Sequence, residues 1–129
     1  MIHRVPSLDL VIYLNADTIG ADVEVVRRSV RLGLLDSALQ APLAGFGDVD
    51  LYPETWQRLG VICSRLVLNH PFLDGNKRTA FLVMLETAAL NAVELEFPDT
   101  IESADMIDGL AARTVSEDDL CEWVRAHLR

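Results

Sequence analysis

Ten consecutive residues, from His70 to Thr79, gather the side chains with which a protein can act on a nucleotide phosphate. They read His-Pro-Phe-Leu-Asp-Gly-Asn-Lys-Arg-Thr. The imidazole of His70 can take a proton from a hydroxyl group at neutral pH, as a general base does. The carboxylate of Asp74 offers the hard oxygen ligands that Mg²⁺ prefers when it also binds substrate phosphates. The segment therefore predicts a catalytic base and a metal ligand on one short loop.

The second half of the segment is suited to holding an anion. Gly75 permits a tight backbone path close to a ligand, and a helix is expected to open at Asn76. Free N–H groups and the positive end of the helix dipole attract phosphate at such a start. Lys77 and Arg78 add two side-chain cations. Lys77 is the single lysine beside ten arginines, which either indicates that a slim ammonium is needed there or reflects chance placement.

Two apolar segments flank the loop and must position it. Before it, apolar side chains at i, i+3 and i+4 spacing predict a helix that starts near Pro53 and Glu54 and closes at Pro71. After it, residues 76–92 are apolar nearly all round, which is typical of a helix buried in the middle of its domain. Phe72 is expected to anchor the loop in the core. The stripe of the first helix consists of Trp56, Leu59, Ile62, Cys63 and Leu66.

The N-terminal part predicts further short elements. Residues 2–5 fit a short strand or an extended lead-in, and Ser7 is a plausible N-cap for a helix. Residues 17–20 indicate a turn or loop, and residues 22–31 fit a strand, an exposed helix face or a loop. A short helix is expected over residues 34–40, before Pro42. Residues 41–53 contain two glycines and two prolines, which is loop or hairpin composition.

The C-terminal part adds one expected strand and two expected helices. Residues 93–97 alternate and predict a short strand before Pro98, and Thr100 is expected to cap a helix to about Arg113. Ser116 and Asp119 predict a capping box for a last helix to Leu128. With 129 residues, half of them hydrophobic, the chain is expected to form a single domain over residues 1–129. The predicted fold class is all-α with one or two short β pieces.

Composition limits the partners and the compartment. A net charge of −9 argues against direct DNA binding. The longest strongly apolar run, residues 80–85, is too short to span a bilayer, and the N-terminus has no signal-peptide pattern, so a cytoplasmic protein without a membrane contact is expected. The two cysteines are expected to be free buried thiols. The late acids predict a solvated face or, as the alternative, a docking face for a basic segment: Asp99, Glu102, Asp105, Asp108, Glu117, Asp118, Asp119 and Glu122.

Other charged and titratable residues are expected to be structural or exposed. His3 and His127 lie near the ends of the sequence and are predicted to be surface residues. Arg58 and Arg65 are predicted to form exposed pairs on the helix before the loop, with contact to the nucleotide as the alternative.

The decad resembles the signature of the Fic family, whose members transfer phosphate-containing groups onto target hydroxyls. That signature reads His-Pro-Phe-x-Asp/Glu-Gly-Asn-Gly-Arg-x-x-Arg. Lys77 stands in place of its second glycine, and Phe81 in place of its last arginine. Both departures, together with the run from Asn76 to Ala80, resemble the death-on-curing (Doc) branch, the toxins of Phd/Doc toxin–antitoxin pairs. The likeness is sharp over residues 66–85 and looser elsewhere. The shared positions are His70, Pro71, Phe72, Asp74, Gly75, Asn76 and Arg78.

The resemblance implies a Fic-like helical domain and a toxin that phosphorylates a Ser/Thr hydroxyl of a translation protein, with elongation factor Tu as the implied target. ATP would be the donor, and Mg²⁺ would be held through Asp74. Asn76 would shape a phosphate loop completed by Gly75, Lys77 and Arg78. A Phd-like antitoxin is the implied partner, because no Glu is followed by Gly or Asn, as the family's inhibitory segment requires.

The resemblance also implies a β-hairpin flap that holds the target chain beside the active site by strand addition. We assign the flap to about Leu43–Tyr52, with Gly45, Phe46 and Gly47 as the target-positioning residues. A plain connecting loop is the alternative. Two other functions stay open: a Fic-type adenylyltransferase, which transfers AMP, and a module that binds nucleotide or partner without turnover.

Overall fold

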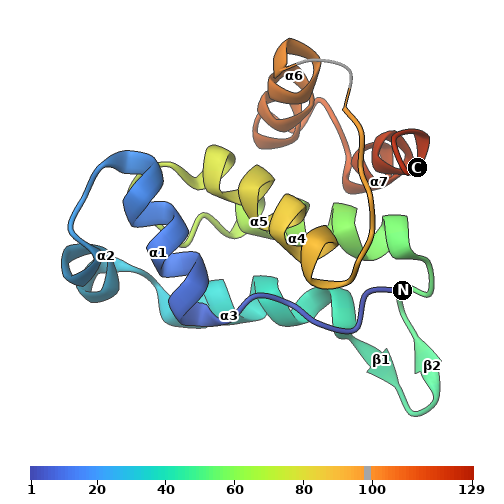
Figure 1. Cartoon of the computed structure of the whole chain (residues 1–129), viewed down its shortest axis with the longest axis horizontal. Helices are drawn as coiled ribbons and strands as arrows, with labels where there is room; N and C mark the ends of the chain where they lie inside the picture. The colour runs from blue at the N-terminus through green and yellow to red at the C-terminus, as the bar shows by residue number, and fades with distance from the viewer. Residues whose placement is uncertain (98–99) are drawn as a thin grey trace.

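A computed structural model describes residues 1–97 and 100–129, so Pro98 and Asp99 lie outside the described residues. In the described part the fold is all-α with one short hairpin, as the sequence predicts (Figure 1). The elements are α1 (Leu8–Ile19), α2 (Val23–Ser29), α3 (Leu32–Gln40), the 3₁₀ turn η1 (Ala41–Leu43), β1 (Gly45–Phe46), β2 (Val49–Asp50), α4 (Thr55–Asn69), α5 (Asn76–Leu90), α6 (Thr100–Ala111) and α7 (Glu117–Ala126).

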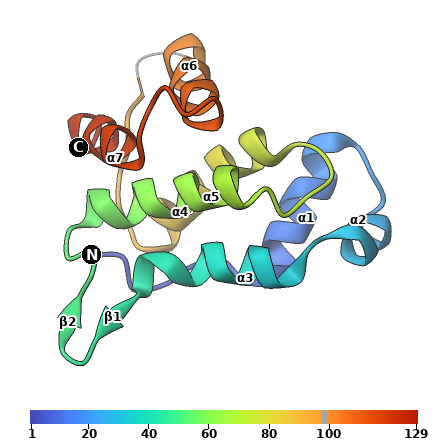
Figure 2. The same ribbon diagram turned by 180° about the vertical axis from the view of Figure 1, so that it is seen from behind.

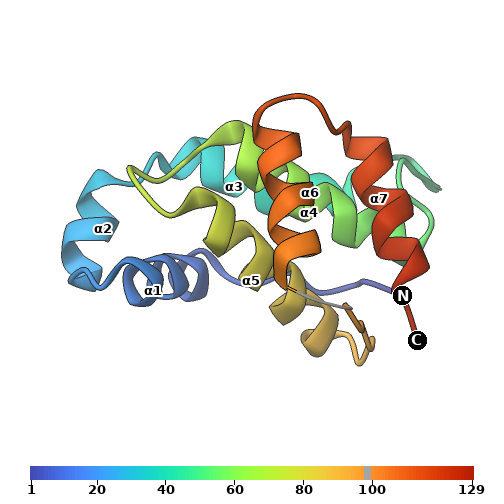
Figure 3. The ribbon, with the colours of Figure 1, turned by 90° about the horizontal axis from the view of Figure 1, so that it is seen from above.

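Helix α4 lies at the centre of the domain, between α3, α5 and α7 (Figures 2 and 3). Its apolar surface is wider than the stripe that the sequence predicts, because it is covered on several sides. Gly60 permits the close approach of α7, since a Cβ atom there would lie 2.5 Å from the Cys121 sulfur. The buried residues of α4 are Arg58, Leu59, Gly60, Val61, Ile62, Cys63, Ser64, Leu66 and Val67.

Helix α5 packs beside α4 and is less central than its composition suggests. Leu90 is exposed, and Leu82 and Leu85 are only partly buried. Its N-terminal half contacts α1 on one side and α6 on the other. The loop that carries the signature residues joins α4 to α5, so both of its ends are fixed by core helices.

Caps confirm several expected helix boundaries. The Ser7 hydroxyl accepts from the Leu10 N–H, and Ser116 and Asp119 form the predicted capping box of α7. Asp22 caps α2, which settles residues 23–29 as helix. The expected turn at residues 17–20 is wrong, because α1 continues to Ile19 and ends at Gly20, whose φ of 68° is left-handed.

The expected strands outside the hairpin are not found among the described residues. Residues 2–5 run as an extended lead-in, with Ile2 fully buried. Within residues 93–97, Leu95 makes one isolated bridge to Leu128. The hairpin itself is confirmed: Gly45 pairs with Asp50, and Phe46 with Val49.

Several charged and titratable residues lie elsewhere than expected. Arg58 is buried and pairs with Asp50 at 2.9 Å, so it joins α4 to the hairpin rather than to solvent. Arg65 is half-buried and pairs with Glu117 at 2.8 Å, which raises its pKa. His127 is not a surface residue, because its ring packs against those of Phe97 and Trp123. His3 is exposed and both cysteines are buried free thiols, as predicted.

Candidate active site

The signature loop begins where α4 ends. His70 is the C-cap of α4 and has left-handed backbone angles, φ 51° and ψ 57°, which turn the chain out of the helix. Pro71 and Phe72 follow and are buried, so the predicted core anchor is confirmed. His70 itself is exposed. The loop therefore presents its imidazole to solvent while the next two residues hold it to the core.

Asn76 fixes the shape of the loop from inside. Its side-chain oxygen accepts a hydrogen bond from the Phe72 N–H at 2.9 Å, and its side-chain N–H₂ donates to the Phe72 carbonyl at 2.8 Å. Asn76 is 5% exposed, so both bonds are shielded from water. Its side chain is committed to the loop, and only its backbone N–H is available at the helix start. The N-cap position belongs to Gly75.

Gly75 is required for two separate reasons. Its φ of 75° lies in the left-handed region that favours glycine. In addition, a Cβ atom there would lie 2.6 Å from a methyl group of Ile19 and 3.2 Å from the Asn15 amide nitrogen. The loop thus passes in close contact with the end of α1, and a larger residue would require the Ile19 side chain to shift.

Asn15 holds this approach together and is a residue that the sequence reasoning missed. It is 1% exposed, on the core side of α1. Its amide donates to the Asp74 carbonyl at 2.9 Å and to the Thr79 hydroxyl at 3.1 Å. The available signal is an amide beside the buried apolar residues of α1, where a polar group needs hydrogen-bond partners. Asn15 therefore ties α1 to the signature loop and to the first turn of α5.

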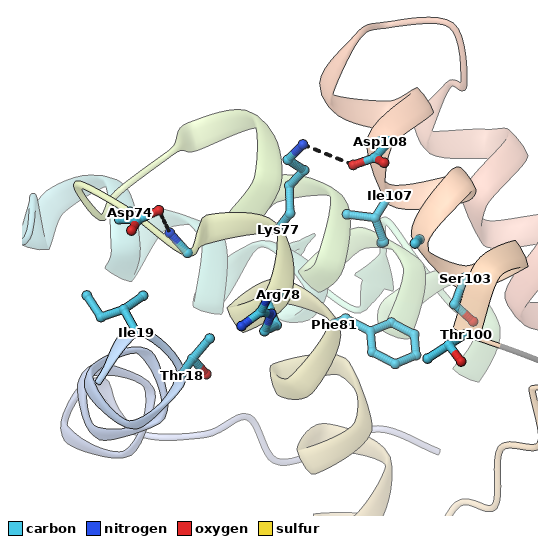
Figure 4. A pocket seen from close by; sticks show the side chains of 12 residues that line it. Thr18, Ile19, Asp74, Lys77, Arg78, Phe81, Thr100, Ser103, Ile107 and Asp108 are labelled. Atoms are coloured by element: carbon cyan, nitrogen blue, oxygen red, sulfur yellow. Dashed lines mark hydrogen bonds and ion pairs between the residues drawn. The ribbon is translucent and has the colours of Figure 1, made fainter. Parts of the chain in front are cut away.

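A cavity of about 670 Å³ opens beside the start of α5, between α1, α5 and α6 (Figure 4). Its size falls within the usual range for a small-molecule site, roughly 300–1,000 Å³. Four of the predicted site residues share this cavity, namely Asp74, Gly75, Lys77 and Arg78. The full lining is Thr18, Ile19, Asp74, Gly75, Lys77, Arg78, Phe81, Thr100, Ser103, Ala104, Ile107 and Asp108.

The start of α5 has the features of an anion-binding end and lies at the cavity. The first main-chain bond of the helix runs from the Thr79 N–H to the Gly75 carbonyl at 2.9 Å. The N–H groups of residues 76–78 precede that ladder, as at any helix start. Lys77 and Arg78 are exposed and line the same cavity. This arrangement suits a phosphate group.

Asp74 offers one engaged and one accessible carboxylate oxygen. Its Oδ1 accepts a hydrogen bond from the Gly75 N–H at 2.7 Å, which orients the carboxylate. The residue is exposed and lines the cavity. A single carboxylate beside the start of α5 fits Mg²⁺, which typically keeps several waters and takes one or two carboxylates plus substrate phosphates. Across the part of the chain that the structure describes, no three His, Cys, Asp or Glu side chains converge on a metal-sized site.

Two sets of predicted site residues lie outside the cavity wall. His70 is four residues before Asp74 on the solvent side of the loop and does not line the cavity. Gly45, Phe46 and Gly47 belong to the hairpin, which precedes the N-terminal end of α4, whereas the signature loop follows its C-terminal end. Since α4 has 15 residues, its ends are about 22 Å apart. The structure does not bring the hairpin to the loop.

Comparison with known proteins decides the family. A model of the Fic/DOC family matches residues 6–88. The chain belongs to the Fic/DOC family. It is also similar to the protein named Toxin Doc from Mycolicibacterium smegmatis, with 34% identity over 89 residues, which cover 68% of each chain. The family match includes α1–α4, the signature loop and all but the last two residues of α5, whereas α6 and α7 lie beyond it.

Among the described residues, no helix has the length and apolar character needed to cross a membrane.

Proposed function

We propose that this chain is a Doc-like toxin that transfers the γ-phosphate of ATP to a Ser or Thr hydroxyl of a translation protein and so inhibits growth. The observation that carries the proposal is the shared cavity. It brings together the start of α5, its two cations and the Asp74 carboxylate, which follows His70 on the same loop. The similarity to a protein named Toxin Doc supports the biological role.

The residues divide the reaction between two sides of the loop. A target hydroxyl arrives from solvent, where His70 is exposed and can take its proton. The hydroxyl oxygen forms a bond to the γ-phosphorus, and the bond from that phosphorus to the β,γ-bridging oxygen breaks, with its electron pair leaving on ADP. Lys77, Arg78 and the N–H groups at the start of α5 stabilise the negative charge that moves onto ADP.

Asp74 is the residue that would hold Mg²⁺ beside the phosphates. A metal ion there supplies charge neutralisation to the phosphoryl oxygens. The proposal therefore expects transfer to stop when the divalent cation is removed by a chelator and to return when Mg²⁺ is restored. Transfer that persists in the chelator contradicts the role of Asp74.

Transfer of AMP is the second candidate, and Gly75 favours it. Glycine at this position matches the AMP-transferring members that the signature resembles, and Gly75 lines the cavity. ATP labelled at the α- or the γ-phosphate distinguishes the two reactions in a cell extract. Label from the γ-phosphate alone supports the kinase, and label from the α-phosphate supports AMP transfer. ATP binding without labelling supports the non-catalytic module.

The hairpin is proposed to contact the target at a distance from the reacting hydroxyl. Its exposed apolar side chains are Phe46, Val49 and Leu51, with exposed fractions of 88%, 67% and 60%. A folded target protein can span the length of α4 between the hairpin and His70. Phe46→Ser is expected to raise the KM for the protein target and to leave the KM for ATP unchanged.

A Phd-like antitoxin is the proposed partner, and the cytoplasm is the proposed compartment. Antitoxin segments of this kind fold onto an apolar surface of the toxin as they bind. Co-expression with the product of a neighbouring small open reading frame tests the partner. Binding together with restored growth supports a toxin–antitoxin pair, and a product that neither binds nor restores growth counts against it.

A further inference from the structure

The single lysine of the chain is paired with an acidic residue across the cavity. The Lys77 ammonium lies 2.9 Å from Oδ1 of Asp108. Lys77 is in the first turn of α5, whereas Asp108 is on α6, and both side chains line the cavity. Figure 4 shows the pair joining the two walls above Arg78. Asp108 lies beyond the residues that the family model matches.

The ion pair between Lys77 and Asp108 contributes little to the stability of the fold. The two side chains are 54% and 62% exposed, and an ion pair so open to water contributes little to stability. Helix α6 is held instead by apolar residues, because Ile107 and Leu110 are buried in the core. The position of the pair at the cavity therefore needs a different explanation from stability.

The geometry sets the carboxylate in competition with phosphate. A phosphate that enters the anion-binding end meets an ammonium that already has an anionic partner, and it meets the Asp108 carboxylate on the facing wall. A polyphosphate must therefore share Lys77 with Asp108, or displace Asp108, before it can pair with the ammonium. We propose that Asp108 competes with the nucleotide phosphates for Lys77 and thereby sets the nucleotide affinity. The inference rests on the proposed function, since it assumes that phosphates bind at the start of α5.

Asp108→Asn tests the competition, because it removes the charge and keeps the shape. We expect the Kd for ATP to fall about threefold or more, the scale of one exposed ion pair, and the KM for ATP to fall with it while kcat changes less. The gain should shrink at high salt, because screening weakens charges in contact with solvent. Inorganic tripolyphosphate, which has no base or ribose, should show the same gain.

Asp105→Asn is the matched control. Asp105 is exposed on the same helix, carries the same charge and does not line the cavity. Its substitution should leave the Kd for ATP unchanged. Equal gains in both variants would show a general effect of net charge and overturn the proposal, as would an unchanged or weakened affinity in Asp108→Asn. Asp108→Ser serves as the second carboxylate-free variant if Asp108→Asn does not fold, and Asp108→Glu should retain the wild-type affinity.

The role of Lys77 is tested by combining substitutions. If Asp108 acts through Lys77, the gain in ATP affinity from Asp108→Asn should be mostly lost in a Lys77→Gln background. The non-additivity of the two substitutions measures the coupling between the two residues. An undiminished gain would overturn the proposal. The same coupling can be followed without turnover, because an amine-reactive reagent modifies one lysine in this chain. Peptide mapping should show faster modification of Lys77 in Asp108→Asn than in the wild type, and equal rates would also count against the competition.

The outcomes separate this inference from the proposed function. If ATP binding responds to Asp108→Asn as expected but no group transfer is found, the transferase is wrong and the competition stands. If transfer is found but the Kd does not respond, the competition is wrong and the transferase stands. If neither ATP nor tripolyphosphate binds to the wild-type protein, both are wrong.

Discussion

Asn76 and Phe72 form a closed pair of hydrogen bonds, in which one side-chain amide serves both the N–H and the carbonyl of a single residue. The pair spans the turn between α4 and α5 and is buried. It thereby makes the five-residue segment from Phe72 to Asn76 a rigid link between His70 and α5. His70 and the first residues of α5 are therefore joined through a hydrogen-bonded turn.

Asn76→Asp is therefore expected to disturb the site and the fold together. Aspartate can still accept from the Phe72 N–H, but it cannot donate to the Phe72 carbonyl and sets a charge against it. A buried acceptor left without its donor costs about 1–3 kcal/mol. Urea unfolding should show a lower midpoint with an unchanged slope. An Asn76→Asp protein as stable as the wild type would mean that the amide does not hold the loop.

His70→Ala is expected to remove activity without loss of stability. The side chain is exposed, so its removal leaves no cavity. General-base catalysis contributes roughly 10²–10⁴-fold, and transfer of the labelled group should fall by about that factor. His3→Ala is the control, because His3 is also exposed but lies outside the loop. Undiminished toxicity of His70→Ala, with an unchanged thermal melt, would falsify the assignment of the base.

Alanine substitutions at Gly20 and Gly75, which both have left-handed backbone angles, separate the cost of backbone strain from the cost of a steric clash. At Gly20, φ is 68° and nothing lies within 4 Å of an added Cβ atom, so Gly20→Ala should cost about 1 kcal/mol from the backbone alone. At Gly75 the same strain is joined by contact with Ile19 at 2.6 Å. Gly75→Ala should therefore be clearly more destabilising and should also weaken ATP binding. Equal losses in stability would remove the argument for close packing at the loop.

Local sequence patterns were sufficient to predict the two helices that flank the signature loop and the burial of Phe72. The periodicity, the prolines and the caps are all properties of neighbouring residues. The misread turn at residues 17–20 has a tertiary cause. Its composition is turn-like, yet the segment stays helical while Ile19 packs against Gly75, which is far away in sequence. The same limit applies to Asn15 and Asp108, whose partners are 59 and 31 residues away.

The burial of Arg58 could not be predicted from the sequence for a different reason. A charged residue on a helix is normally assigned to solvent, since burial of an unpaired charge is strongly unfavourable. Here the guanidinium donates to the carbonyls of Tyr52 and Ile2 and pairs with Asp50. Those partners come from an irregular segment, the lead-in and the hairpin, and no local pattern indicates that they converge. The composition of residues 41–53 predicts the hairpin. It does not predict that the length of α4 separates the hairpin from the signature loop.

Stability should fall in alkaline solution because of the buried thiols. Burial raises the pKa of Cys63 to about 12, and that of Cys121 to about 12. An unfolded thiol ionises near pH 8.5. Between that pH and 12 the unfolded chain releases protons that the folded chain keeps, so the free energy of unfolding decreases as the pH rises, by up to about 1.4 kcal/mol per pH unit for one thiol. Below about pH 7 the thiols should contribute almost no pH dependence.

Urea unfolding at pH 8.0, 9.0 and 10.0 measures this effect. The comparison is with Cys63→Ala, which lacks the most buried thiol and should lose stability less steeply over the same interval. The two proteins share every titratable side chain except Cys63, so the difference between the two slopes isolates that cysteine. Identical slopes would show that the Cys63 thiol is not kept protonated by the fold.

Lys77 is expected to decide which phosphorus faces His70. The glycine found at this position in the common Fic signature leaves the helix start open to the inner phosphates, so that the α-phosphate faces the base. In this chain a side chain occupies that place and carries the ammonium that lines the cavity. Phe81, where the signature has its last arginine, puts an aromatic ring into the same wall instead of a cation for the outer phosphates. Both differences favour a nucleotide that presents its γ-phosphate.

Lys77→Gly is the substitution that tests this orientation, and the intact mass of the modified target gives the result. The wild type should add the mass of one phosphate, whereas Lys77→Gly should transfer phosphate more slowly and add AMP in its place. Lys77→Gln is the matched control: it removes the charge but keeps a side chain at the helix start. Phosphate from Lys77→Gln together with AMP from Lys77→Gly assigns the orientation to occupied space, and AMP from both assigns it to charge. AMP on the target of the wild-type protein would overturn the kinase itself.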